Sequence, residues 1–99
     1  MKIDIGNDFS KLVGVRTKED GDFSGEEFRE NFLEPAMHRN QSTTILLDSL
    51  EGYTASFMEE AFGGIVRKHG QKAFDLIKFE AKERAYLIPQ IRTWMKEAL

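Results

Sequence analysis

One short apolar run constrains the fold of this chain more than any other segment. Residues 43–48 read Thr-Thr-Ile-Leu-Leu-Asp, with three β-branched residues and no charge before the last position. A continuous apolar run of this length is typical of a strand that is buried on both faces. The sequence therefore predicts a central strand at 43–48, and the flanking segments must supply the helices and strands that cover it.

Two segments with helix-start motifs flank this strand. Ser24 precedes Glu27, and Ser56 precedes Glu59, at the spacing at which a serine caps a helix while the glutamate reaches back. We therefore predict helices that begin at these serines, the second one ending near His69. Both helices carry apolar residues at helical spacing: Phe28, Phe32, Leu33, Ala36 and Met37 in the first, and Phe57, Met58, Ala61, Phe62, Ile65 and Val66 in the second.

Three residues conflict with regular helices. Pro35 lacks an N–H, so it should kink the first helix or end it after Glu34. Gly63 and Gly64 should each cost about 1 kcal/mol relative to alanine in a helix interior. Either a close approach of the backbone to the sheet or to a partner compensates this cost, or the second helix breaks there.

The remaining elements are shorter. Strands are predicted at 2–5, at 12–16 and at 74–79, the last with Phe74, Leu76 and Phe79 pointing inward. A final helix should begin near Pro89 and bury a stripe formed by Ile91, Trp94, Met95 and Ala98. This order predicts an α/β sandwich with a mixed four-stranded sheet and about three helices, in a single domain that spans 1–99.

Charge and composition exclude several function classes. A net charge of −3 argues against a broad phosphate-binding surface, so no nucleic-acid partner is expected. No apolar run approaches the length of a membrane span, and the first residues do not form a secretory signal, so we expect no membrane contact. Cysteine is absent, which excludes thiolate metal sites and cysteine nucleophiles and fits a cytoplasmic location.

The polar residues form no recognisable catalytic or metal-binding motif. Glu59 and Glu60 are adjacent on a predicted helix and point about 100° apart, so we expect them to complement the helix dipole rather than to act as an acid/base pair. His38 and His69 lack a second histidine or a carboxylate at a familiar ligand spacing, so we expect both at the surface and no metal site. We predict no enzyme activity, no catalytic residue and no cofactor.

Two stretches resemble a known family. Asp-Gly at 20–21 followed by Ser-Gly-Glu-Glu-Phe-Arg at 24–29, and Ser-Phe-Met-Glu-Glu-Ala-Phe-Gly-Gly-Ile-Val-Arg at 56–67, are similar to the STAS-like domain family of unknown function. The second stretch is the more specific, because its glycine pair and flanking aromatic residues are unusual in a generic amphipathic helix. The resemblance implies a fold similar to the anti-sigma-factor antagonists of bacteria, which are small α/β proteins that are not enzymes and that bind a histidine-kinase-type ATPase.

The resemblance also implies a regulatory position. In those antagonists the partner phosphorylates a serine or threonine at the start of the helix after the central strand, and phosphorylation breaks the complex. Here that location holds Thr54 and Ser56, within Tyr-Thr-Ala-Ser-Phe at 53–57 instead of an Asp-Ser-Ser-Gly type of signature. Either the two hydroxyls retain the switch as phosphoacceptors, or the switch is lost and Ser56 only caps the helix.

The leading hypothesis is a cytoplasmic regulatory module that binds a partner protein through Tyr53, Thr54, Ser56, Glu59 and Glu60. The alternative is a small-ligand-binding domain or enzyme that uses the loop around Arg16 and Ser24, which requires a concave pocket at those residues. Arg16 either faces that ligand or organises its loop through a salt bridge. We expect a monomer or a weak homodimer formed through the first strand or the last helix, in which case Trp94 would be exposed.

Overall fold

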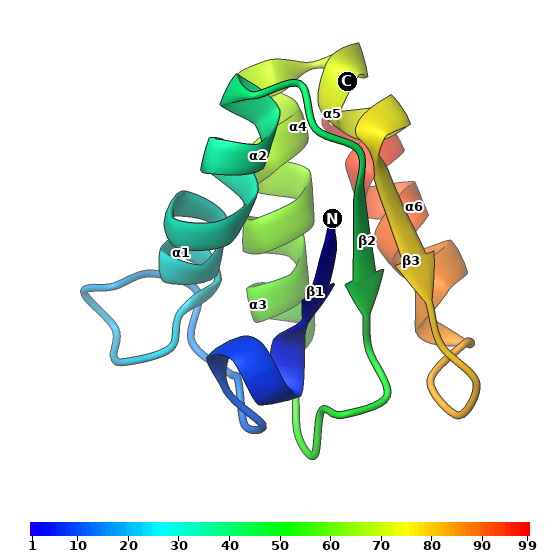
Figure 1. Cartoon of the computed structure of the whole chain (residues 1–99). Helices are drawn as coiled ribbons and strands as arrows, with labels where there is room; N and C mark the ends of the chain where they lie inside the picture. The colour runs from blue at the N-terminus through cyan, green and yellow to red at the C-terminus, as the bar shows by residue number, and fades with distance from the viewer.

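The computed structural model describes residues 1–99 and contains one parallel sheet of three strands (Figure 1). The strands are β1 (Lys2–Asp4), β2 (Thr43–Leu46) and β3 (Ile77–Glu80), in the spatial order β1-β2-β3. Ile45 of β2 lies opposite Ile3 of β1 and opposite Phe79 of β3. The central position of β2 is therefore confirmed, whereas the expected mixed sheet of four strands is wrong.

The missing strand is the one predicted at 12–16. This segment forms a single bridge between Leu12 and Gly52 and then continues as a loop. The carbonyl groups of Val15 and Arg16 accept hydrogen bonds from the N–H groups of Gly25 and Glu26, each at 3.0 Å. These carbonyls therefore bond to the N-terminus of a helix and not to a neighbouring strand.

The first predicted helix begins at Ser24 and runs to His38 without ending at Pro35. It comprises α1 (Gly25–Phe28), a wide π-type turn η2 (Arg29–Leu33) and α2 (Glu34–His38). The N–H of Glu34 donates to the carbonyl of Arg29 across the wide turn. The hydrogen-bond pattern then restarts with Pro35 in the first turn of α2, where a missing N–H costs nothing.

The second predicted helix has the same construction. It comprises α3 (Ala55–Met58), the π-type turn η3 (Glu59–Gly63) and α4 (Gly64–His69). We call the two continuous segments, 25–38 and 55–69, the first and second rods. Gly70, with φ of +66°, ends the second rod as expected.

The chain beyond Gly70 differs from the prediction. The carbonyl of Gly70 accepts from the N–H of Ala73 and of Phe74, which starts a further helix, α5 (Gln71–Leu76). The strand therefore begins only at Ile77, and Ile77 is the buried residue, whereas Phe74 and Leu76 are partly exposed. The last helix, α6 (Leu87–Glu97), begins close to the predicted position with Pro89 in its first turn.

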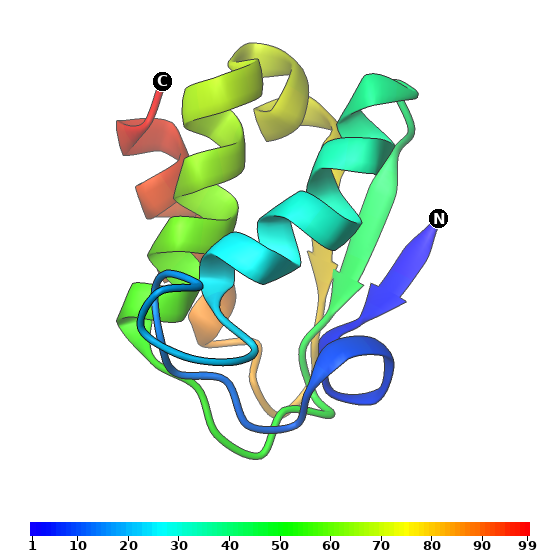
Figure 2. The ribbon, with the colours of Figure 1, turned by 90° about the vertical axis from the view of Figure 1, so that its left-hand side faces the viewer.

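The helices α1 to α6 lie on one face of the sheet, and the other face is open, while the short π-type turn η1 (Ile5–Phe9) follows the end of β1 (Figures 1 and 2). The expectation that β2 is buried on both faces is therefore wrong: Ile45 is fully buried, but Thr44 and Leu46 point to the open side and remain partly exposed. The helices and the covered face share one apolar core, in which the ring of Phe62 lies 5.0 Å from that of Phe79. The open face carries Lys2, Asp4, Thr44, Leu46, Lys78 and Glu80.

Helix lengths also bear on the membrane question. None of the helices combines the length and the hydrophobicity that crossing a bilayer requires.

The final helix packs against η3, and Trp94 is half-buried against the core instead of exposed. The structure therefore lacks the exposed Trp94 that would have favoured a homodimer formed through α6.

Candidate functional site

The start of the second rod is built around Thr54. Its Oγ1 accepts a hydrogen bond from the N–H of Phe57 at 3.1 Å and donates to the carbonyl of Gly14 at 2.6 Å. Thr54 is therefore the N-cap, and the expectation that Ser56 caps this helix is wrong. Ser56 lies in the first helical turn with its side chain exposed.

The same motif at the first rod is confirmed. Ser24 is fully buried, and its Oγ accepts from the N–H of Glu27 at 3.0 Å. The carboxylate of Glu27 reaches back one residue further than expected and accepts from the N–H of Phe23 at 3.1 Å. Ser24 is thus a structural cap without an accessible hydroxyl.

Glu59 and Glu60 converge on Arg16, contrary to the expected divergence of adjacent helical residues. The Arg16 Nη1 atom lies 2.7 Å from a carboxylate oxygen of Glu59 and 3.3 Å from one of Glu60. Arg67 also binds Glu59, at 2.6 Å. The two glutamates lie in the wide turn η3, beyond the first turn where the helix dipole acts, so their role is to bind arginines.

The pKa values reflect these ion pairs. Arg67 and then Arg16 donate hydrogen bonds that lower the pKa of Glu59, although partial burial acts in the opposite direction. The Glu59 carboxylate correspondingly raises the pKa of Arg16 and of Arg67. Of the two roles left open for Arg16, the structure shows the salt bridge that organises its loop.

A buried arginine joins the two rods. Arg29 is only 5% exposed, and its guanidinium lies 3.2 Å from a carboxylate oxygen of Glu60 and 3.5 Å from one of Glu34. A Cβ atom on Gly64 would lie 2.9 Å from the Nε atom of Arg29, and one on Gly63 would lie 2.5 Å from a Glu59 oxygen. The glycine pair is thus compensated by close approach to side chains of this ion network, and not by contact with the sheet.

Tyr53 is held beside this helix start by the segment that follows β3. Its hydroxyl lies 2.6 Å from that of Tyr86, and the Arg84 guanidinium stacks over its ring at 5.2 Å. The hydrogen bond between the tyrosines raises the pKa of Tyr53 and lowers that of Tyr86. Arg84 also donates to the carbonyl of Leu50 at 2.7 Å, so the turn before the second rod is fixed from this side as well.

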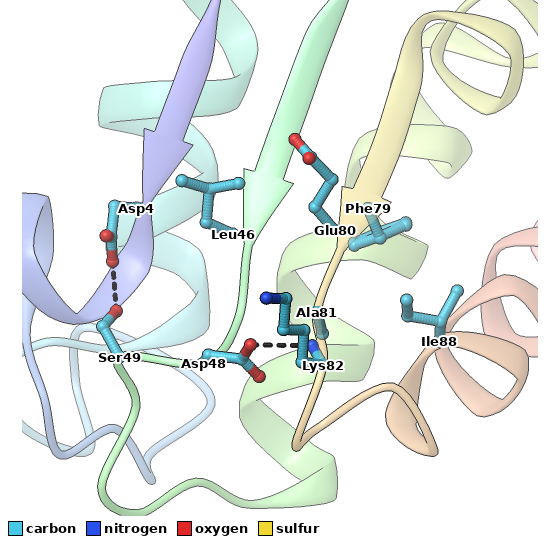
Figure 3. A pocket seen from close by; sticks show the side chains of 9 residues that line it. All are labelled: Asp4, Leu46, Asp48, Ser49, Phe79, Glu80, Ala81, Lys82 and Ile88. Carbon is cyan, nitrogen blue, oxygen red and sulfur yellow. Dashed lines mark hydrogen bonds between the residues drawn. The ribbon is translucent and has the colours of Figure 1, made fainter.

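A pocket of about 500 Å³ lies at the carboxyl ends of the strands (Figure 3). Within it Ser49 donates to Asp4 and accepts from the N–H of Gly6 at 2.9 Å. Asp48 accepts from the N–H groups of Lys82 and Arg84, and these bonds lower its pKa. The pocket is lined by Asp4, Leu46, Asp48, Ser49, Phe79, Glu80, Ala81, Lys82 and Ile88.

Sequence reasoning missed this pocket, although Asp4 and Asp48 each lie at or just after the end of a strand, where pockets of parallel sheets form. A second hollow of about 290 Å³ is lined by Ile77, Lys78, Phe79, Ile88 and Arg92. Neither one includes Arg16 or Ser24. The pocket that the ligand-binding alternative requires at those residues is therefore not present.

The two histidines lie together at the far end of the rods. Their ring centroids are 5.3 Å apart, and His69 Nε2 lies 3.2 Å from a carboxylate oxygen of Glu34. The expectation of two separate surface histidines is wrong, since His38 is exposed but His69 is partly buried. The four-residue spacing of Glu34 and His38 on one helix was the available signal, but the approach of His69 depends on the packing of the rods.

Comparison with known proteins bears on the fold that carries these residues. Residues 24–83 match a family described as a STAS-like domain of unknown function. The chain belongs to this STAS-like family. The matched region of this STAS-like domain contains both rods, β2 and β3, and the resemblance drawn from its sequence is confirmed. No curated protein and no solved structure matches the chain.

Proposed function

We propose that this STAS-like domain is a non-enzymatic regulatory module that binds a partner protein through the turn at 52–56 and the exposed side of the second rod. The observation that carries the proposal is the different state of the two hydroxyls at this turn. Thr54 is bound to the backbone on both sides, at Gly14 and Phe57, while Ser56 is exposed on the helix that Thr54 fixes. Both residues are exposed, but only the hydroxyl of Thr54 is engaged in hydrogen bonds with the backbone, so Ser56 is the freer of the two candidate phosphoacceptors.

The position of Ser56 suits a switch by charge. A phosphate in the first turn of a helix meets free N–H groups and the positive end of the helix dipole, so the folded domain would tolerate it. A partner packed against the same surface would instead have to accommodate close to two added negative charges. Phosphorylation would then weaken the complex without unfolding the domain.

Glu59 and Glu60 contribute to this surface indirectly. Their side chains are about 24% and 18% exposed, whereas the arginines that they hold, Arg16 and Arg67, are 39% and 46% exposed. A partner would therefore meet guanidinium groups more readily than carboxylates. Acidic or aromatic residues on the partner would complement them.

We propose a histidine-kinase-type ATPase as the partner, because the anti-sigma-factor antagonists that the STAS-like family resembles bind partners of that type. The test is affinity capture from a lysate of the source organism, with mass spectrometry, using wild type, Ser56→Asp and Ser42→Asp. Ser42 is an exposed serine before β2 and provides the matched control for an added charge. Enrichment of an ATP-binding protein with wild type and Ser42→Asp, but reduced with Ser56→Asp, supports the proposal.

Two results would count against it. Equal recovery of the partner with all three baits would remove Ser56 from the interface. Absence of any protein enriched over a bait-free control would remove the support for a partner-binding module.

A further inference from the structure

Three potential metal ligands converge where the two rods end. Glu34 and His38 lie one helical turn apart in α2, and His69 is the last residue of α4. One carboxylate oxygen of Glu34 and one ring nitrogen from each histidine all lie within 4.8 Å of one another. The cluster lies at the opposite end of the second rod from Ser56, so it does not include the proposed phosphoacceptor.

The surroundings fix the orientation of Glu34. Its Oε2 atom faces the Nη1 of Arg29 at 3.5 Å and the Nζ of Lys68 at 3.7 Å, while its Oε1 atom faces the Nε2 of His69 at 3.2 Å. Arg29 is buried, and its Nη1 atom, which makes no hydrogen bond, places a positive charge beside the carboxylate on the core side. Oε1 is thereby left directed toward the two imidazoles, as outer neighbours commonly orient a metal-binding carboxylate.

The local charges act in both directions on a bound cation. Arg29 and Lys68 repel it, but both face Oε2 of Glu34 and not the Oε1 atom that faces His69. The cluster also lies at the C-terminal ends of both rods, where the helix dipoles favour positive charge. A divalent ion at this place would neutralise the carboxylate and the exposed carbonyl ends together.

We propose that Glu34, His38 and His69 bind a divalent transition-metal ion of the Zn²⁺ class, with water completing the coordination. Two imidazole nitrogens and one carboxylate oxygen suit Zn²⁺ and Co²⁺, whereas Mg²⁺ and Ca²⁺ require a set of oxygen ligands. Bonds of about 2.0–2.2 Å require the ligand atoms to draw closer together. His38 is exposed and makes this movement, while Glu34 and His69 stay in place.

The consequence is a link between the two rods. The ion replaces the hydrogen bond between His69 and Glu34 by bonds to residues on both rods, so it stabilises the folded state by binding it in preference to the unfolded chain. This inference is independent of the proposed function, because Ser56 takes no part in it.

Isothermal titration of the chain with Zn²⁺ tests the proposal, using protein without a polyhistidine tag that has been dialysed against a chelator. We expect saturation at one ion per chain, a higher melting temperature with Zn²⁺ but not with Mg²⁺, and visible absorption bands when Co²⁺ is bound. His38→Ala should weaken Zn²⁺ binding at least about tenfold, because loss of even an outer partner of a ligand typically costs that much, and should abolish the Co²⁺ bands. Arg39→Ala is the matched control at the adjacent exposed position, and Ser56→Asp should bind Zn²⁺ like the wild type.

His38→Ala is the informative variant because His38 is exposed and its removal leaves the Arg29 pairs with Glu34 and Glu60 intact. Its circular dichroism spectrum should match that of the wild type. Failure of the wild type to bind Zn²⁺ in saturable fashion would overturn the proposal. Equal Zn²⁺ affinity in the wild type and His38→Ala would do the same.

Discussion

Thr54 and Ser56 lie two positions apart and yet have different chemical environments. The hydroxyl of Thr54 takes part in two hydrogen bonds of the fold, because it accepts from the N–H of Phe57 and donates to the carbonyl of Gly14 across the turn. The hydroxyl of Ser56 makes neither of these hydrogen bonds. A regulatory site needs both conditions at once, namely a fixed helix start and a hydroxyl that can react without dismantling it.

Replacing Thr54 and Ser56 in turn tests which of the two hydroxyls caps the helix. Thr54→Ala should lower the free energy of unfolding by about 1 kcal/mol, because it removes an N-cap that also ties the helix to Gly14. Ser56→Ala, the matched control, should change it by less than about 0.5 kcal/mol. Urea-induced unfolding measures both, and equal losses in the two variants would show that the cap is assigned to the wrong residue.

The pH dependence of stability should depend on Glu59. Its pKa is lowered in the folded protein, chiefly by Arg67, so the unfolded chain binds this proton more readily than the folded one. The stabilisation is therefore present at neutral pH and is lost as the pH falls through the lowered pKa. Glu59→Gln should destabilise the protein at about pH 7, and the difference from the wild type should shrink toward about pH 3.

Chemical denaturation at the two pH values provides the measurement. Glu51→Gln, at an exposed position that forms no ion pair, is the matched control and should show little effect at either pH. If the loss in Glu59→Gln has the same size at neutral and at acid pH, the ion pairs with Arg67 and Arg16 do not stabilise the fold.

At the level of the elements, the crossing of the two rods depends on a glycine. A Cβ atom on Gly25 would lie 2.6 Å from the carbonyl oxygen of Phe57 and 3.0 Å from the Cβ of Glu60. Helix propensity alone would favour alanine at position 25. Close packing of α1 against the second rod should reverse that preference.

Gly25→Ala should thus destabilise the protein by about 1–3 kcal/mol, the usual cost of forcing an extra group into a packed contact. Gly14→Ala is the matched control, because its new Cβ would lie an ordinary 3.6 Å from the nearest atom, in Thr54. It should change stability by less than about 0.5 kcal/mol in the same thermal or urea unfolding assay. A neutral Gly25→Ala variant would mean that the rods separate easily.

Local patterns predicted some of these elements and misplaced others. Alternation at 2–5, the apolar run at 43–48 and the cap at Ser24 depend on neighbours in sequence, and there the prediction holds to within a few residues. The second cap is Thr54 and not the predicted Ser56. Residues 74–76 alternate like a strand, but the carbonyl of Gly70 accepts from the N–H groups of Ala73 and Phe74 and so starts α5 there. Residues 12–16 read as a strand, but their carbonyls complete the start of α1.

The candidate site was less accessible to sequence reasoning, because its contacts connect distant positions. Arg16 and Glu59 are 43 positions apart, and Arg29 and Glu60 are 31 apart. No periodicity signals such pairs, and the wide turns that bring Glu59 and Glu60 to one guanidinium have no clear sequence pattern. The sequence identified the turn at 53–56, but only the structure shows that the hydroxyl of Thr54 caps the helix and that of Ser56 does not.

At the scale of the whole molecule, one apolar cluster extends from β1 through both rods to α6. Ile91 and Met95 of α6 are fully buried in it, and Trp94 packs against it. We therefore expect residues 1–99 to unfold in one step, with the urea midpoint from Trp94 fluorescence equal to that from far-ultraviolet circular dichroism. A lower midpoint for Trp94 would show that α6 detaches before the rest unfolds.

The molecule also presents three surfaces: the Ser56 face, the open face of the sheet with its pocket, and the histidine cluster.

The most direct test of which surface binds the partner is a nuclear magnetic resonance titration of the isotope-labelled domain with the partner that affinity capture identifies. Our account predicts that amide shifts concentrate at residues 52–56 and along the exposed side of the second rod, and that they diminish for Ser56→Asp. Shifts confined to the open sheet face around Thr44 and Lys78 would contradict it.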